Sequence, residues 1–331
     1  MEAKCVLGYI TVSHPPTRRR LNTPKRAVPA EPPSLKLEEF LRLNAPDDLA
    51  ALTYAIAKSS VDVWDSIPFK TGLLTGSNPS GDAQKAIDVF SNDLFVEALT
   101  STGHAAEVAS EEMEEPVASK GGVSVAMDPL DGSSNVETNN PLGSIFGFYS
   151  RRLPASGRSL VGALYVTYGT MLTLTFSFGK GVHRFVALRE GAAMSFQLLG
   201  VNLKLPDRPE VYGFGGSRKE WVDAAARFWA SLDGRGLRNR YCGTFVGDYN
   251  QVLARGGIFS YPALVNKPRG KLRVLFECAP MAYINEQAGG YASDGTKNML
   301  DVAPSGLAET SPLYIGSAGL VREVEQSLSS A

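Results

Sequence analysis

The chain has 331 residues, of which 44% are hydrophobic and 20% are charged. This composition is that of a soluble globular protein with a large core, long enough for two subdomains or one large α/β unit. The 33 basic and 34 acidic residues give a formal net charge of −1, so no overall field favours a nucleic acid or a membrane surface as a partner. We expect neither partner, and any anion-binding site must be local.

Cysteine and histidine usage narrows the chemistry. Cys5, Cys242 and Cys278 are an odd number without C-x-x-C spacing, which disfavours a disulfide framework and a zinc site and fits a reducing cytoplasm. None of the three histidines lies beside a candidate nucleophile, so a Ser-His or Cys-His mechanism lacks support. Carboxylates are therefore expected to carry the acid–base chemistry.

The N-terminal segment, residues 1–34, is predicted to be a disordered extension, because residues 1–33 hold six prolines and six basic residues against two acids. The scarcity of acids leaves organelle targeting open. The scarcity of serine argues against a transit peptide, and no apolar core marks a secretory signal. A cytoplasmic location is the primary expectation.

The next part of the chain, residues 35–205, is predicted to mix helices with strands. Apolar periodicity indicates a pair of helices over 35–66, and a glycine-rich stretch over 72–81 indicates a flexible loop before a helix over 87–99. Strands are expected at 105–109, 123–127, 144–149 and 172–177.

The uncharged run over 159–179 is long enough to be weighed as a membrane span. Eight of its residues are Ser, Thr or Tyr, Gly169 interrupts it, and polar residues alternate with apolar ones after the glycine. This pattern favours a buried segment, a turn and a strand over a transmembrane helix.

The C-terminal part, residues 206–331, is predicted to be an α/β subdomain. Helices are expected over 219–232 and 273–287 and at the C-terminus as far as residue 328. Strands are expected at 257–261 and 313–316. The whole is thus expected to be a mixed α/β protein with two subdomains that meet at residues 205 and 206.

One short segment has the layout of a metal and phosphate site. Asp128 and Asp131 end an apolar run, and Pro129 between them forbids an ordinary continuation of the strand, so both carboxylates are expected to face one point. The turn that follows, Gly132–Ser134, offers backbone N–H groups and two hydroxyls to a phosphate. An Asx-rich surface turn is the alternative for such a pattern.

Further charged residues accompany this segment. If Glu111 converges with Asp128 and Asp131, each pair at 4 Å repels by about 4 kcal/mol at an effective dielectric constant of about 20. Cations must then bind, and all-oxygen ligands select a hard divalent ion such as Mg²⁺. For Glu111 and its neighbour a solvated acidic turn is the alternative, and Lys271, Arg273 and Glu277 are either site residues or surface charges.

Five motifs occur in an order that resembles the class I fructose-1,6-bisphosphatases, within the lithium-sensitive, metal-dependent sugar phosphatase superfamily. They are GDxxxxxDVxSND at 81–93, SEE at 110–112, DPLDGSS at 128–134, GIFxYP at 257–262 and GKLRxLxExxPMAY at 270–283. The resemblance runs from about residue 35 to the C-terminus and implies a layered αβαβα fold. It implies hydrolysis of the 1-phosphate of fructose 1,6-bisphosphate, in gluconeogenesis or Calvin-type metabolism.

The resemblance also implies roles for individual residues. Two or more Mg²⁺ ions, for which Mn²⁺ substitutes, would be bound by Glu111, Asp128, Asp131, Glu277 and the carbonyl of Leu130. Asp88 and Glu112 would activate the attacking water. The phosphates would be held by Gly132, Ser133 and Ser134 at the scissile end and by Tyr241, Tyr261 and Lys271 at the distal end. Arg240 would reach in from a neighbouring subunit, which implies a homodimer or homotetramer.

Two segments depart from the family pattern. Residues 212–219 lack the usual Asn and Tyr of the distal phosphate site, for which Arg218 is a candidate replacement. Residues 45–49 and 121–123 lack the family's nucleotide-binding residues, so control by AMP is not expected.

Other enzyme classes remain as alternatives. Segments 276–280 and 293–295 also resemble sedoheptulose-1,7-bisphosphatase, so that activity or a dual one stays open, as does an inositol-type monophosphatase. A non-catalytic sugar-phosphate sensor is disfavoured because all the expected carboxylates are present.

Overall fold

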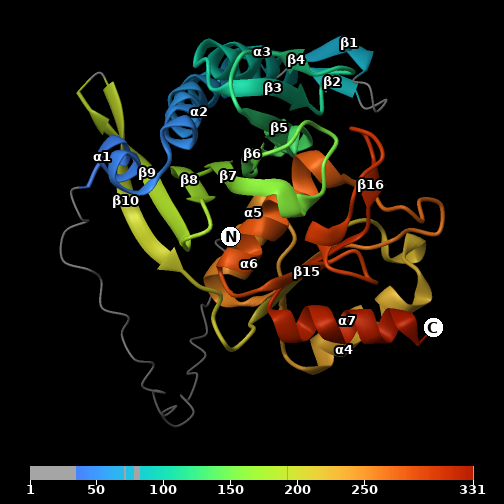
Figure 1. Ribbon diagram of the computed structural model, residues 1–331. Coiled ribbons are helices and arrows are strands. Elements are labelled where there is room, and N and C mark those ends of the chain that lie inside the picture. The colour runs from blue at the N-terminus through green and yellow to red at the C-terminus, as the bar shows by residue number, and fades with distance from the viewer. Residues whose placement is uncertain (1–34, 71, 78–82, 192, 331) are drawn as a thin grey trace, which may run out of the picture. The chain divides into compact units, whose positions relative to one another are not determined.

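Two large β-sheets organise the protein, alternating with helices in five layers (Figure 1). The computed structural model describes residues 35–70, 72–77, 83–191 and 193–330. The extension predicted for residues 1–34 lies outside these residues. The described residues belong to one compact unit.

The first layer consists of the helices α1 (Leu37–Asn44), α2 (Asp47–Ser66) and α3 (Ala86–Ser101). The predicted pair of helices over 35–66 is confirmed, and its apolar face is buried, with Leu52 and Ile56 at 0% exposure. Phe95 of α3 packs edge-on against Phe146 of the sheet with ring centroids 5.0 Å apart. This apolar contact fixes the first layer on the sheet that carries the site.

The second layer is an eight-stranded sheet in the order β10-β9-β8-β7-β6-β5-β3-β4. Its strands pair antiparallel except for the parallel pair β3 and β5. They are β3 (Ala105–Ser110), β4 (Val117–Ala118), β5 (Val123–Asp131), β6 (Leu142–Tyr149), β7 (Leu160–Tyr168), β8 (Leu172–Ser177), β9 (Val182–Glu190) and β10 (Ala193–Leu203).

The uncharged run over 159–179 forms β7, a turn and β8, as its alternation predicts. In the part of the chain that the structure describes, no helix is both long and apolar enough to cross a membrane.

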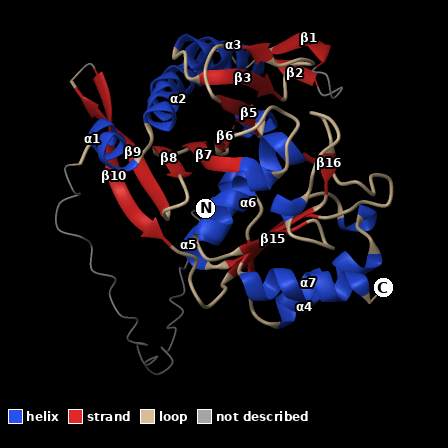
Figure 2. Cartoon of the chain, in the orientation of Figure 1, coloured by secondary structure: helices blue, strands red, loops and turns tan. Residues whose placement is uncertain are grey.

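The other three layers belong to the C-terminal part of the chain. Helices α5 (Phe245–Arg255) and α6 (Ala279–Gln287) lie between the large sheet and a five-stranded one, and α4 (Asp223–Gly234) and α7 (Ala318–Ser329) cover its far face (Figure 2). The five-stranded sheet has the order β12-β11-β13-β17-β15. Its strands are β11 (Val211–Phe214), β12 (Arg238–Asn239), β13 (Gly257–Tyr261), β15 (Tyr291–Ser293) and β17 (Leu313–Gly316). The predicted αβαβα fold is therefore confirmed.

Short elements complete the described residues. Two small antiparallel ladders pair β1 (Leu73–Ser77) with β2 (Ala83–Lys85) and β14 (Leu272–Arg273) with β16 (Thr310–Ser311). Short helical segments are η1 (Ile67–Phe69), η2 (Ser133–Thr138), η3 (Gly157–Ser159), η4 (Arg218–Glu220), η5 (Val274–Cys278) and η6 (Met299–Asp301). Of the loop predicted over 72–81, residues 73–77 form β1 instead, and 78–81 lie outside the described residues.

Two predicted helices begin later than expected. The helix expected over 219–232 begins at Asp223, because the backbone of Trp221 and Val222 is extended. The helix expected over 273–287 is divided into the end of β14, the π-helical turn η5 and α6. Pro280 explains the start of α6, because proline lacks an N–H and is tolerated in a first helical turn.

The strand β5 also differs from expectation. It does not stop at Met127 but continues through Pro129 to Asp131, with a shift in its pairing to β6 between Asp128 and Asp131. Proline fits at such an irregularity because the local ladder does not require its missing N–H. The irregularity turns the strand end toward the site described next.

Candidate active site

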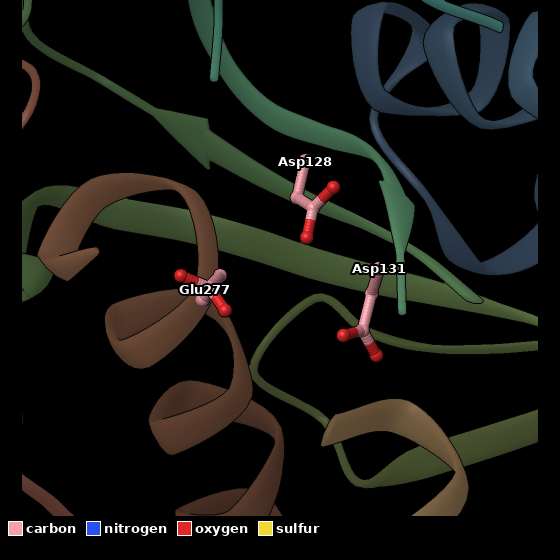
Figure 3. A group of neighbouring side chains, drawn as sticks. All are labelled: Asp128, Asp131 and Glu277. Carbon is pink, nitrogen blue, oxygen red and sulfur yellow. The ribbon is translucent and has the colours of Figure 1, made fainter. Parts of the chain in front are cut away.

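Three buried carboxylates meet between the two sheets. Asp128 and Asp131 come from the end of β5, and Glu277 comes from η5 (Figure 3). One oxygen atom from each lies within 4.8 Å of the others, and the residues are only 5–8% exposed. The two aspartates of the predicted site therefore face one point, as expected, and Glu277 joins them from the other part of the chain.

Gly132 makes the turn that follows the aspartates. Its φ of 76° is in the left-handed region, and a Cβ atom there would lie 2.6 Å from the Cβ of Thr244. Residues other than glycine are excluded by both the angle and the contact. The chain then enters η2, whose first residues, Ser133 and Ser134, line the same cleft as the carboxylates.

The carboxylate of Asp131 accepts hydrogen bonds from the start of α5. The Thr244 hydroxyl donates to Oδ2 at 3.0 Å, the Val246 N–H to Oδ2 at 2.7 Å, and the Phe245 N–H to Oδ1 at 3.2 Å. These donors hold the carboxylate in one orientation beside Asp128 and Glu277.

Arg273 is the cation closest to the acidic group among the described ion pairs. Its Nη1 lies 2.7 Å from Glu111 and 4.0 Å from Glu277, and its backbone N–H donates to Glu277 at 2.6 Å. Arg273 is 7% exposed, so the interpretation of this residue as a surface charge is wrong. It neutralises part of a cluster that would otherwise be strongly repulsive.

Burial is the main cause of the raised pKa values in the cluster. It raises the pKa of Glu111 and Asp128 well above their ordinary values and raises the pKa of Asp131, and neighbouring carboxylates raise the first two further. Burial raises the pKa of Glu277 to about 7 despite the opposing effect of Arg273. Such a group binds protons or cations, and its all-oxygen donors fit a hard divalent metal ion.

Asp88 lies at the start of α3 on another side of the cleft. Its Oδ2 accepts a hydrogen bond from the Lys85 N–H at 2.7 Å, and burial, assisted by the charge of Glu112, raises its pKa to about 6. A carboxylate with this pKa is mostly ionised at neutral pH and still basic enough to accept a proton from water.

A cleft of about 580 Å³ contains nearly all of the residues predicted from the sequence. Those that line it are Asp88, Glu111, Glu112, Asp128, Leu130, Asp131, Gly132, Ser133, Ser134, Tyr241, Tyr261, Lys271 and Glu277. Arg240 does not line the cleft of its own chain and is exposed. Arg218, the candidate replacement at the distal phosphate, lies over the Trp229 ring at 4.5 Å and is also outside the lining.

Several lining residues were not assigned to the site from the sequence. Lys85 is buried and pairs with Glu137 at 2.8 Å. Thr244 contacts Asp131, and Asp248 accepts hydrogen bonds from the N–H groups of Cys242 and Gly243. A Ser or Thr before an apolar helical pattern is the sequence signal for an N-cap such as Thr244. Its contact with Asp131 depends on long-range packing and has no local signal.

The fold and this cleft define a class of protein. A layered αβαβα structure with a buried carboxylate cluster beside a small, hydroxyl-rich turn fits the sugar phosphatases. The relatives show that the chain is a phosphoric monoester hydrolase. Family models narrow the class. "Fructose-1-6-bisphosphatase, N-terminal domain" matches residues 65–197, and "Fructose-1-6-bisphosphatase, C-terminal domain" matches residues 205–329. The chain belongs to the fructose-1,6-bisphosphatase family.

Individual relatives agree with this assignment. The chain is 40% identical to a class 1 fructose-1,6-bisphosphatase of Halobacterium salinarum, over 85% of this chain and 98% of the relative. It is 41% identical to one of Pelobacter propionicus, over 85% of this chain and 89% of the relative. The holo structure of Leishmania major fructose-1,6-bisphosphatase superposes with a TM-score of 0.84 at 29% identity, covering 91% of this chain and 100% of the other.

The raised pKa of Glu277 predicts how stability depends on pH without metal. Between its ordinary value of 4.5 and about 7, the folded protein holds a proton that the unfolded chain releases, so stability falls as pH rises. Asp131 reinforces this effect, whereas Arg273 and Lys271 oppose it. Glu277→Gln should remove this contribution, which is on the order of 1–3 kcal/mol.

The measurement is urea unfolding in EDTA at pH 5 and pH 8. The wild-type protein should lose more stability between these values than Glu277→Gln does. An equal loss in both proteins would show that Glu277 does not carry a raised pKa. Asp207→Asn, at an exposed position, is the matched control and should follow the wild type.

Proposed function

We propose that the cleft hydrolyses the 1-phosphate of fructose 1,6-bisphosphate to give fructose 6-phosphate and phosphate. The observation that carries this proposal is the meeting of Asp128, Asp131 and Glu277 next to the Gly132–Ser134 turn. The names of the relatives support the six-carbon bisphosphate over the seven-carbon and inositol alternatives.

The residues around the acidic cluster fit Mg²⁺, with Mn²⁺ as a substitute. Asp128, Asp131, Glu277 and the neighbouring Glu111 would hold two or more ions together with the carbonyl of Leu130. When bound, such ions polarise a phosphoryl group and stabilise the charge that develops on the departing sugar oxygen. Arg273, paired with Glu111, would limit the excess negative charge before they bind.

The protein's own groups would divide the remaining work. Asp88, assisted by Glu112, would accept the proton of the attacking water, since its pKa of about 6 suits a general base. The N–H groups of Gly132, Ser133 and Ser134 and the two serine hydroxyls would hold the oxygens of the transferred phosphoryl group. Lys85 would keep this turn in register with Asp88 through its ion pair with Glu137.

The distal phosphate would bind at the opposite side of the cleft. Lys271 offers a charge-assisted contact, and its Nζ lies 5.8 Å from the centre of the Tyr261 ring. Tyr241 lines the same cleft and offers a hydroxyl. We assign the distal phosphate to these three residues and to Arg240 from a neighbouring subunit of a homodimer or homotetramer.

The same proposal includes the organisation and location of the chain. We place the boundary of its two subdomains at residues 205 and 206, which is supported by family models that end at 197 and begin at 205. We place the protein in the cytoplasm on the basis of its cysteine usage.

Asp128→Asn should reduce Mg²⁺-dependent phosphate release at least about 100-fold, since even outer partners of a metal site cost 10–100-fold when removed. The fold should survive. Without metal the variant should melt at the same or a higher temperature, because its carboxylate is buried among Glu111, Asp131 and Glu277.

The test combines phosphate release with melting in EDTA and in Mg²⁺, and Asp207→Asn serves as the control. A variant that melts much lower in EDTA would make Asp128 a structural residue. Turnover near that of the wild type would remove it from the metal site.

Arg240→Ala should raise KM for the bisphosphate more than it lowers kcat, because contact with a non-reacting phosphate contributes mainly to ground-state binding. Arg238→Ala is the matched control, since Arg238 is also exposed, lies two residues away and pairs with Glu210 at 2.8 Å. An equal effect of the two substitutions on KM would speak against a role for Arg240 in substrate binding.

A second experiment tests whether the residue serves the adjacent subunit. Hybrids of Arg240→Ala and Asp128→Asn subunits should contain one intact site and regain activity. Verified hybrids without any regained activity would exclude sharing.

AMP at millimolar concentration should leave activity nearly unchanged. The helix α2 begins with Asp47 and Asp48 in its first turn, and Asp48 accepts a hydrogen bond from the Leu49 N–H at 2.8 Å. Two acids at a helix N-terminus repel a phosphate there, and Asp48 occupies one of the N–H donors. Phosphate release measured against increasing AMP checks this, and strong inhibition would refute it.

A further inference from the structure

The helix α5 starts at the candidate metal site, and Thr244 is its N-cap. The Thr244 Oγ1 accepts a hydrogen bond from the Gly247 N–H at 3.1 Å, which is the ordinary capping interaction. The same hydroxyl donates its proton to Asp131 Oδ2 at 3.0 Å. Capping the helix requires only the first of these bonds, so the second is available for another purpose.

The second bond belongs to a larger arrangement around Asp131. The N–H groups of Phe245 and Val246, which lack partners within the helix, donate to the same carboxylate. Helix α5 has 11 residues, and its N-terminus carries a partial positive charge that favours the ionised form of Asp131. Oδ2 accepts two of these bonds and Oδ1 accepts one, which leaves a lone pair on Oδ1 for a cation.

Thr244 also contacts the phosphate turn, which is the segment Gly132–Ser134 that would hold the phosphoryl group. Thr244 is 2% exposed. Its Cβ lies against Gly132, so closely that a Cβ atom added to the glycine would be only 2.6 Å away. Asn135, in the turn after Gly132, donates to the carbonyl of Cys242 at 2.9 Å. The segment before α5 is thus attached to both ends of the turn that begins at Asp131.

We infer that Thr244 is a positioning residue, whose hydroxyl orients Asp131 as a ligand for the divalent cation and sets the phosphate turn beside it. This role rests on the proposed function, because it takes Asp131 to bind the metal ion. Removal of the Thr244 hydroxyl weakens cation binding through Asp131, and its effect on phosphate release follows from that.

Two substitutions remove the hydroxyl in different ways. Thr244→Val keeps the shape of the side chain but loses both hydrogen bonds. Thr244→Gly also loses the hydroxyl, but glycine is nearly as good an N-cap as threonine, so this variant retains a stable start of α5. Thr244→Ser keeps both bonds and is the rescue variant.

The chain offers a matched control for a buried threonine. Thr53 in α2 is 0% exposed, and among the described residues its Oγ1 has no hydrogen-bond partner. Thr53→Val therefore changes the same atoms in a core position away from the cleft lining. It should behave like the wild type toward cations.

The first readout is the melting temperature of the full chain in EDTA and over a series of Mg²⁺ concentrations, which reports binding independently of catalysis. The wild type, Thr244→Ser and Thr53→Val should show the same rise with Mg²⁺. Thr244→Val and Thr244→Gly should need about ten-fold more Mg²⁺ for the same rise, as for other outer partners of metal sites. The Mg²⁺ concentration for half-maximal phosphate release should shift in parallel.

The outcomes separate this role from capping and from the proposed function. If Thr244→Val melts lower in EDTA but both variants show the wild-type dependence on Mg²⁺, the hydroxyl only caps α5 and the inference is wrong. If the wild type itself does not respond to Mg²⁺, the proposed metal site is wrong and the inference fails with it. A shift in both variants with rescue by Thr244→Ser establishes the role.

Discussion

The repulsion among buried carboxylates is the constraint on which the rest of this structure depends. Asp128, Asp131 and Glu277 are held within 4.8 Å of one another, in surroundings that strongly disfavour their charges. Arg273 offsets only part of this cost, and the positive end of α5 offsets another part. The fold thus concentrates negative charge at one place, where bound cations relieve the repulsion. This suits the site to metal-dependent chemistry.

The layered fold determines where these carboxylates meet. The end of β5 supplies two of the carboxylates, and the π-helical turn before α6 supplies the third, so the cluster lies where the eight-stranded sheet meets the helices packed on it. Irregular backbone occurs at both places, as a shift in pairing at Asp128–Asp131 and as η5 around Glu277. Departures from regular geometry are common where side chains must be aimed at a functional site.

Local patterns predicted much of this arrangement. The D-P-x-D spacing and Gly132 predicted two aspartates at a turn, because a few consecutive residues determine that geometry. Apolar periodicity likewise predicted α2 and β8. The split of 273–287 was missed, because an apolar run with good helix formers does not show that Leu272–Arg273 pairs with β16. The burial of Arg273 and the contact of Thr244 with Asp131 depend on distant partners, and the role proposed for Arg240 would depend on another subunit.

The bond between Asp131 and the Val246 N–H joins residues that are 115 positions apart in the chain. Contacts of such separation form after local structure, because closing a long loop costs entropy before the contact repays it. Neither the N-terminal nor the C-terminal part of the chain contains the complete cluster. Asp128 and Asp131 lie in the N-terminal part, whereas Glu277 and the donors of α5 lie in the C-terminal part. The group of three carboxylates is therefore complete only once synthesis has passed residue 277.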